Sequence, residues 1–222
     1  TPKLAIDMKA SNNKISLPQS HLTPLQQSLL YLHFSTQAGA KKSCTIYQSF
    51  TVENLDTERL QSAWLKLVNT HEMLRASFTE EGNLLIGEVL SAYVIPTIPH
   101  TPIAIDNLLQ QEFDLQKGPL FNIAISQENE NKSWVHLNTN VLLADGKSLF
   151  LIYEQLFQLY KNLEAKIAIS TDTFFRHLNT LSEGEGLSAN ATKYWNQRYS
   201  NLVATPAFKG LDQNKKGTKQ RL

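Results

Sequence analysis

The spacing of apolar residues divides this chain into helices and strands. Apolar positions three or four residues apart predict a helix that begins near Thr23–Pro24, and longer helices at about 57–74 and 148–163. Apolar residues that alternate with polar ones predict strands at about 44–52, 120–127 and 134–141. Weaker patterns predict a strand at 84–90 and helices at 106–112, 171–182 and 188–200. Strands that interleave with helices imply a mixed α/β layer architecture.

Two of the predicted helices have a definable apolar face. In the first, Leu25, Leu29 and Leu32 share one side of the helix. In the second, Asp56 or Thr57 is placed to cap the N-terminus, because both residue types accept hydrogen bonds from a first helical turn. Its apolar stripe consists of Leu60, Trp64, Leu67 and Val68. We expect both faces to be buried.

Composition excludes several classes of function. The 222 residues are 41% hydrophobic and 18% charged, and the formal net charge is +1, so neither nucleic acid nor an anionic membrane is expected as a partner. No apolar run reaches membrane-spanning length. The single cysteine excludes an internal disulfide and indicates a reducing, cytoplasmic compartment. The histidines lack the spacing of a metal site and no phosphate or dinucleotide motif is present, so we expect no bound cofactor or metal.

The segment 140–146 is the most informative part of the chain. It follows the predicted strand 134–141 and precedes a predicted helix, which places Asp145–Gly146 at a strand-to-helix corner. No histidine and no second acid lies beside Asp145, so the corner lacks an obvious general base.

Five segments together resemble the condensation-domain superfamily of nonribosomal peptide synthetases. They follow one another in the family's order, at 22–27, 60–78, 113–121, 145–148 and 194–195. The resemblance implies a two-layer sandwich like one lobe of chloramphenicol acetyltransferase, in which helices pack on a mixed sheet. It implies an N-terminal lobe at 21–205, while the polar residues 1–20 indicate a linker and the polar, basic end of the chain indicates a flexible tail or inter-lobe linker at 206–222. Because the chain covers about half of such a domain and starts at Thr1, we expect it to be a piece of a longer polypeptide.

The resemblance also identifies the site residues. The family's signature has two histidines before its Asp-Gly pair, and these positions are Asn140 and Val141 here. Valine cannot accept a proton, so amide condensation by the second histidine is in doubt. The heterocyclisation branch carries polar residues at the positions of Asn140, Asp145 and Ser148, with an acid where this chain has Asn140. His136 shares strand parity with Asn140, and it is either a compensating base or an ordinary strand histidine.

Structural roles are expected for the remaining corner residues. Asp145 is expected to form an ion pair with Arg75, since the resemblance places the two motifs together. Gly146 would permit a tight turn or the close approach of a thioester-bearing arm, and Ser148 would either cap the following helix or take part in catalysis.

Three functions remain open. The first is an N-terminal condensation lobe that handles acyl or aminoacyl thioesters on the phosphopantetheine arms of carrier proteins, with altered or no condensing activity. Its partners would be acyl or peptidyl carrier proteins, the C-terminal lobe and neighbouring synthetase domains. The second is a non-catalytic module that docks carrier proteins. The third is a small acyltransferase of the chloramphenicol acetyltransferase type, which the valine at position 141 disfavours. Whether this lobe alone is an enzyme stays open.

Overall fold

The computed structural model describes residues 15–17, 22–35, 45–167 and 189–200. Residues 1–183 and 184–222 form two compact units, and each is described by itself. The predicted helix 171–182 and the expected tail 206–222 lie outside the described residues.

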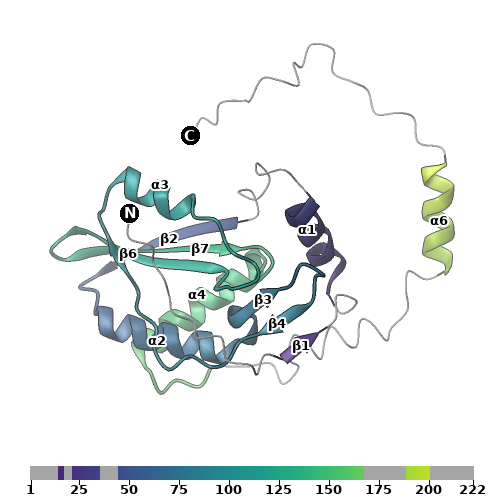
Figure 1. Ribbon diagram of the computed structural model, residues 1–222. Coiled ribbons are helices and arrows are strands. Elements are labelled where there is room, and N and C mark those ends of the chain that lie inside the picture. The colour runs from purple at the N-terminus through teal and green to yellow at the C-terminus, as the bar shows by residue number, and fades with distance from the viewer. Residues whose placement is uncertain (1–14, 18–21, 36–44, 168–188, 201–222) are drawn as a thin grey trace, which may run out of the picture. The chain divides into compact units, whose positions relative to one another are not determined.

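A four-stranded mixed sheet is the centre of the first unit, with the strand order β2-β7-β6-β5 (Figure 1). β6 (Phe121–Asn129) and β7 (Lys132–Asn140) form an antiparallel hairpin. β2 (Thr45–Glu53) pairs antiparallel with β7, and β5 (Thr97–Ile98) pairs parallel with β6. The three strands that alternation predicted are therefore confirmed, with bounds shifted by one or two residues.

Two helices cover one face of this sheet. α2 (Thr57–Thr70) and α4 (Gly146–Lys161) lie side by side below the sheet in Figure 1 and contact each other. The predicted stripe of α2 is confirmed, because all four of its apolar residues are buried. The N-cap is Asp56, whose carboxylate accepts from Arg59 N at 3.0 Å. The largest fully buried side chains between these layers include those of Trp64, Leu67, Phe121, Leu137 and Leu156.

α3 (Pro102–Leu109) lies on the other side of the sheet from α2 and α4 (Figure 1). It begins where Thr101 caps Ala104 N and a proline occupies the first turn. Its Leu108 is buried, outside the main core cluster. The helix was predicted at 106–112, so the prediction placed its start four residues too late, because it missed this cap.

A second, three-stranded sheet has the order β1-β4-β3. β3 (Ala76–Phe78) and β4 (Leu84–Ile86) form a hairpin, and Gly82 in its turn has a φ of +83°. β1 (Ile15–Leu17), within the segment expected to be a linker, pairs antiparallel with β4. A 3₁₀ helix, η2 (Glu72–Arg75), connects α2 to β3.

α1 (Pro24–Ser35) begins where predicted, but it buries a different face. Thr23 and Gln26 form a reciprocal capping box, in which Gln26 N donates to Thr23 Oγ1 and Thr23 N donates to Gln26 Oε1. Leu22, Gln26 and Leu30 are buried, whereas Leu25 is 64% exposed. The predicted stripe of Leu25 and Leu32 is therefore wrong, because a polar residue occupies the centre of the buried face.

α6 (Ala189–Tyr199) is the described helix of the second unit, close to the predicted range 188–200. Trp195 contacts Tyr194 and Tyr199 through its ring, at centroid distances of 5.2 and 5.8 Å. Among the helices described in either unit, none combines the length and the apolar character that crossing a bilayer requires.

Candidate functional site

The candidate site lies where β7 ends and the chain turns towards α4. His136, Asn138 and Asn140 alternate along β7, so they share the sheet face opposite α2 and α4, as the strand parity predicted. All three side chains are buried. Asn138 is fully buried, and neither atom of its side-chain amide has a hydrogen-bond partner among the residues that the structure describes. This face is therefore polar as well as covered, which is unusual for a sheet interior.

Hydrogen bonds from three directions fix the turn that follows Asn140. Asn140 N donates to Leu120 O at 2.9 Å, and Asn140 O accepts from Leu143 N at 3.0 Å. The Asn140 side chain closes the turn, since its Oδ1 accepts from Leu142 N at 3.0 Å. Gln26 of α1 donates through Nε2 to Leu142 O at 3.1 Å. This contact brings the segment 22–27 against the turn after β7, and the sequence did not predict it.

Val141 lies at the centre of this turn and is partly exposed. None of the four hydrogen bonds around the turn uses its side chain. An isopropyl group has neither a lone pair nor a proton to exchange, so position 141 supplies no acid or base.

Asp145 caps α4 and does not pair with Arg75. Its Oδ1 accepts from Ser148 N at 2.8 Å, and the residue is exposed. Hydrogen bonds from the backbone and side chain of Ser148 lower the pKa of the Asp145 carboxyl below its ordinary value. The expected ion pair is wrong, and Ser148 is the capped residue, not the cap.

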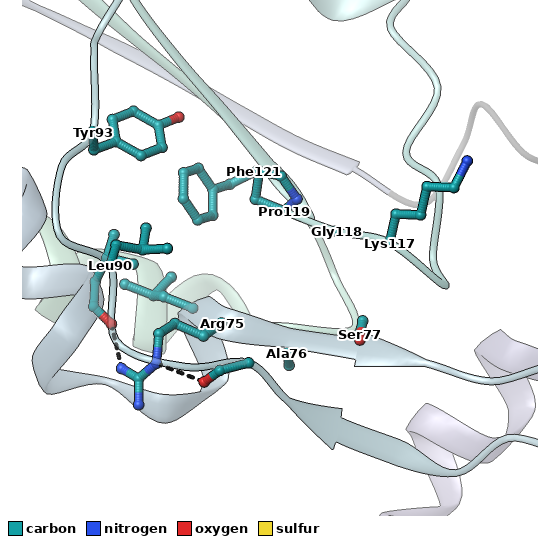
Figure 2. A pocket seen from close by; sticks show the side chains of 12 residues that line it. Arg75, Ala76, Ser77, Leu90, Tyr93, Lys117, Gly118, Pro119 and Phe121 are labelled. Carbon is teal, nitrogen blue, oxygen red and sulfur yellow. Dashed lines mark hydrogen bonds between the residues drawn. The ribbon is translucent and has the colours of Figure 1, made fainter. Parts of the chain in front are cut away.

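Arg75 satisfies backbone carbonyls near its own segment instead. Its Nε donates to Gly87 O at 3.1 Å, and its Nη1 donates to Val68 O and Asn69 O, both at 2.7 Å. Figure 2 shows this guanidinium at the edge of a small cavity lined by Tyr93 and Phe121. Partial burial lowers the pKa of the Arg75 guanidinium. Arg75 therefore joins the end of α2 to the segment after β4, and it is not a site residue.

His136 cannot serve as an exposed base, because it is 1% exposed and both ring nitrogens are engaged. Nδ1 lies 2.7 Å from Tyr47 Oη, and Nε2 lies 2.7 Å from Ser126 Oγ. Ser126 Oγ lies a further 2.9 Å from His100 Nδ1. Burial, and then the nearby His100, lower the pKa of His136 below its ordinary value, which favours the neutral imidazole. The interpretation of His136 as an ordinary strand histidine fits this geometry.

Glycine is required at a different place from the one expected. A Cβ atom on Gly146 would meet nothing within 4 Å, and its φ is not positive, so no tight turn demands this glycine. Gly118, in the segment 113–121, has a φ of +64°, and a Cβ atom there would lie 3.4 Å from Ala76 O. The Gly-Pro pair of that segment therefore permits the chain to pass closely over β3.

A cleft of about 400 Å³ opens beside Asn140. The end of α1 contributes His33 and Phe34, and the segment 112–116, which includes the start of the third motif, forms most of another wall. Glu80, from the turn after β3, completes the lining. The sequence did not predict this cleft. Its acidic residues, Glu80 on one side and Glu112 and Asp114 on the other, come from segments far apart in the chain.

Comparison with known proteins identifies the family. The family model described as "Condensation domain" matches residues 19–220. A linear gramicidin synthase from Brevibacillus parabrevis is 26% identical over 93% of this chain, and surfactin synthase subunit 1 of Bacillus subtilis (strain 168) is 30% identical over 48% of it. The chain spans about 3% of the length of each of these two relatives.

Solved structures agree with this assignment. The synthetase FmoA3 matches with a TM-score of 0.67 and 25% identity, over 85% of this chain and 20% of that one. The starter condensation domain of rhizomide synthetase matches with a TM-score of 0.67 and 17% identity, over 86% of this chain and 49% of that one, which supports the fold alone. The expected α/β lobe, with helices packed on a mixed sheet, is therefore confirmed. This chain belongs to the condensation-domain family of nonribosomal peptide synthetases, and it corresponds to the N-terminal lobe.

Proposed function

We propose that this lobe receives acyl or aminoacyl groups, carried as thioesters on the phosphopantetheine arms of carrier proteins, and that it does not supply the base for ordinary amide condensation. One observation supports the absence of a base for condensation. Val141 stands in the turn after β7, at the position where the family signature has its second histidine, and the neighbouring candidates do not replace it. His136 is buried with both nitrogens engaged, and Asp145 is held as a helix cap.

The remaining partners in this proposal are the C-terminal lobe and the neighbouring synthetase domains. The relatives are synthetases many times longer than this chain, which supports a lobe that works beside other domains. The solved cyclization-docking bidomain of EpoB from Sorangium cellulosum, which has the same fold, likewise joins a domain of this kind to a docking domain.

The test is turnover with loaded carrier proteins. The protein is mixed with an acyl-loaded donor carrier and an aminoacyl-loaded acceptor carrier, and the tethered products are identified by mass spectrometry. We expect carrier binding without a new amide. Val141→His is the informative variant, and Val141→Leu is its matched control, because no hydrogen bond of the turn uses this side chain. An amide formed by the unaltered protein would overturn the assignment of an inactive site.

A heterocyclisation activity is the alternative. Asn140, Asp145 and Ser148 would supply it, and Asp145 Oδ1 and Ser148 N are already joined at 2.8 Å. The same experiment separates the two proposals when the acceptor carrier is loaded with cysteine, serine or threonine. The side-chain thiol or hydroxyl then attacks the carbonyl carbon of the new amide, and loss of that oxygen as water makes the cyclised product lighter than the linear amide by one water. Carrier binding with neither product is the outcome that the first proposal predicts, and it would count against heterocyclisation.

A further inference from the structure

The turn after β7 presents residue 141 at one of its corners. Residues 140–143 form a four-residue turn, because Asn140 O accepts from Leu143 N at 3.0 Å, and Val141 is the first of its two central residues. The direction of the Val141 side chain therefore depends on how the neighbouring peptide groups are held. Leu142 N is held within the turn, since it donates to Asn140 Oδ1 at 3.0 Å. The Leu142 carbonyl is held from outside the turn.

Gln26 of α1 supplies this outside contact. Its Nε2 donates to Leu142 O at 3.1 Å, and both residues are buried. Because a buried carbonyl that loses its donor is costly, the turn is favoured in the conformation that keeps this bond. The main chain of Asn140 attaches the start of the turn to Leu120 O, beside β6, whereas Gln26 attaches its second half to α1. Two separate elements therefore fix the orientation of the turn.

The two ends of the Gln26 amide have separable roles. Oε1 accepts from Thr23 N and from Thr23 Oγ1, both at 3.1 Å, as the capping box of α1 requires. These contacts determine which atom of the amide is the oxygen, so the nitrogen is the atom that faces Leu142 O. The capping box does not use the nitrogen. Oε1 therefore caps α1, and Nε2 holds the turn.

We propose that Gln26 is a positioning residue for position 141, because its side-chain nitrogen holds the turn in the one conformation that fixes the direction of the residue presented there. The inference rests on the function proposed above, since it names the residue that orients the position where the family signature has its second histidine. Gln26 acts through the Leu142 carbonyl. The start of α1 and the corner after β7 are coupled, and a change in α1 that breaks the bond alters the presentation of residue 141.

The methyl groups of Val141 are a native probe of the turn, and two variants separate the roles of Gln26. NMR methyl spectra of valine-labelled protein are recorded from mildly acidic to mildly alkaline pH. Gln26→Glu keeps an acceptor for the capping box, but an ionised carboxylate cannot donate to Leu142 O. Thr23→Val removes the hydroxyl of the box and keeps the Gln26 nitrogen. Protonation of the introduced carboxyl at lower pH restores a donor, which provides a rescue within one variant.

At the alkaline end we expect Gln26→Glu to shift or split the Val141 methyl signals, and these signals should return towards those of the unaltered protein as the pH falls. The signals of Val68 and Val135, which are fully buried in the core, should stay in place. Thr23→Val should leave the Val141 signals unchanged.

Three outcomes would overturn the proposal. They are unchanged Val141 signals in Gln26→Glu, equal changes in the two variants, and loss of the Val68 and Val135 signals together with those of Val141, which would mark Gln26 as a residue that only supports the fold. Binding of loaded carrier proteins is measured in parallel. If carriers bind and Val141 does not respond, only this inference fails, and if Val141 responds and carriers do not bind, only the proposed function fails.

Discussion

Gln26 donates from its side-chain amide to the backbone carbonyl of Leu142, 116 positions further along the chain. Both residues are buried, so the bond joins α1 to the turn after β7 and is shielded from solvent. We expect Gln26→Leu to leave this carbonyl unpaired and to lower the free energy of unfolding by about 1–3 kcal/mol. Urea denaturation measures the change. Ser28→Ala, on the exposed side of the same helix, is the control and should cost much less.

Arg75 and Asp145 should contribute to stability independently. Arg75→Lys loses the forked geometry that reaches three carbonyls, and we expect it to cost about 2–3 kcal/mol. In a double-mutant cycle with Asp145→Ala, the two losses should add within about 0.5 kcal/mol, because the residues share no contact. A coupling energy well above that value would indicate a direct interaction between Arg75 and Asp145, contrary to the partners that the structure gives them.

The cap at Asp145 should be worth about 1 kcal/mol at neutral pH, measured as the loss of unfolding free energy in Asp145→Ala. Asp145→Asn keeps an acceptor for Ser148 N and should lose less. Since the pKa of Asp145 is lowered in the folded protein, its ionised form stabilises the fold fully above about pH 3.9, the ordinary value. The stabilisation by the ionised carboxylate is lost as the pH falls through the lower pKa that Asp145 has in the folded protein. A stability difference between the unaltered protein and the Asp145→Asn variant that persists unchanged in strong acid, below both pKa values, would contradict this account.

His136 should make the fold less stable in mild acid. Because its pKa is lowered in the folded protein, the unfolded chain takes up a proton first as the pH falls below about 6.5. The free energy of unfolding should therefore decrease from neutral pH downwards, until the pH reaches the lower pKa of the folded state. His136→Gln keeps polar contacts but cannot be protonated, so its stability should depend less on pH over this interval. Parallel pH profiles of the two proteins would show that His136 is not the responsible group.

The elements that could be predicted are those whose buried face is apolar throughout. Leu60, Trp64, Leu67 and Val68 recur at helical spacing, and the structure buries all of them in α2. α1 shows the limit of the pattern. Its buried face contains Gln26, which a hydrophobic pattern counts as exposed, and the error moved the predicted stripe to the wrong side of the helix.

The strand-to-helix corner was predicted and is present between β7 and α4, but the partners of its side chains were not predicted. Arg75 meets backbone carbonyls, and a carbonyl acceptor leaves no trace in the amino-acid sequence. His136 was correctly placed on the same sheet face as Asn140, yet its burial depends on what covers that face. The acids of the cleft come from separate segments, so only the folded chain brings them together.

In the turn after Asn140, the groups that fix the backbone differ from the side chain that position 141 presents. Its shape is fixed by main-chain groups and by the side chains of Asn140 and Gln26, and residue 141 takes no part through its side chain. A sequence can therefore exchange the group presented at that position, a base for an inert side chain or the reverse, without rebuilding the surrounding chain. In this lobe, a single substitution can change the group presented at position 141 while the hydrogen bonds that fix the turn stay in place.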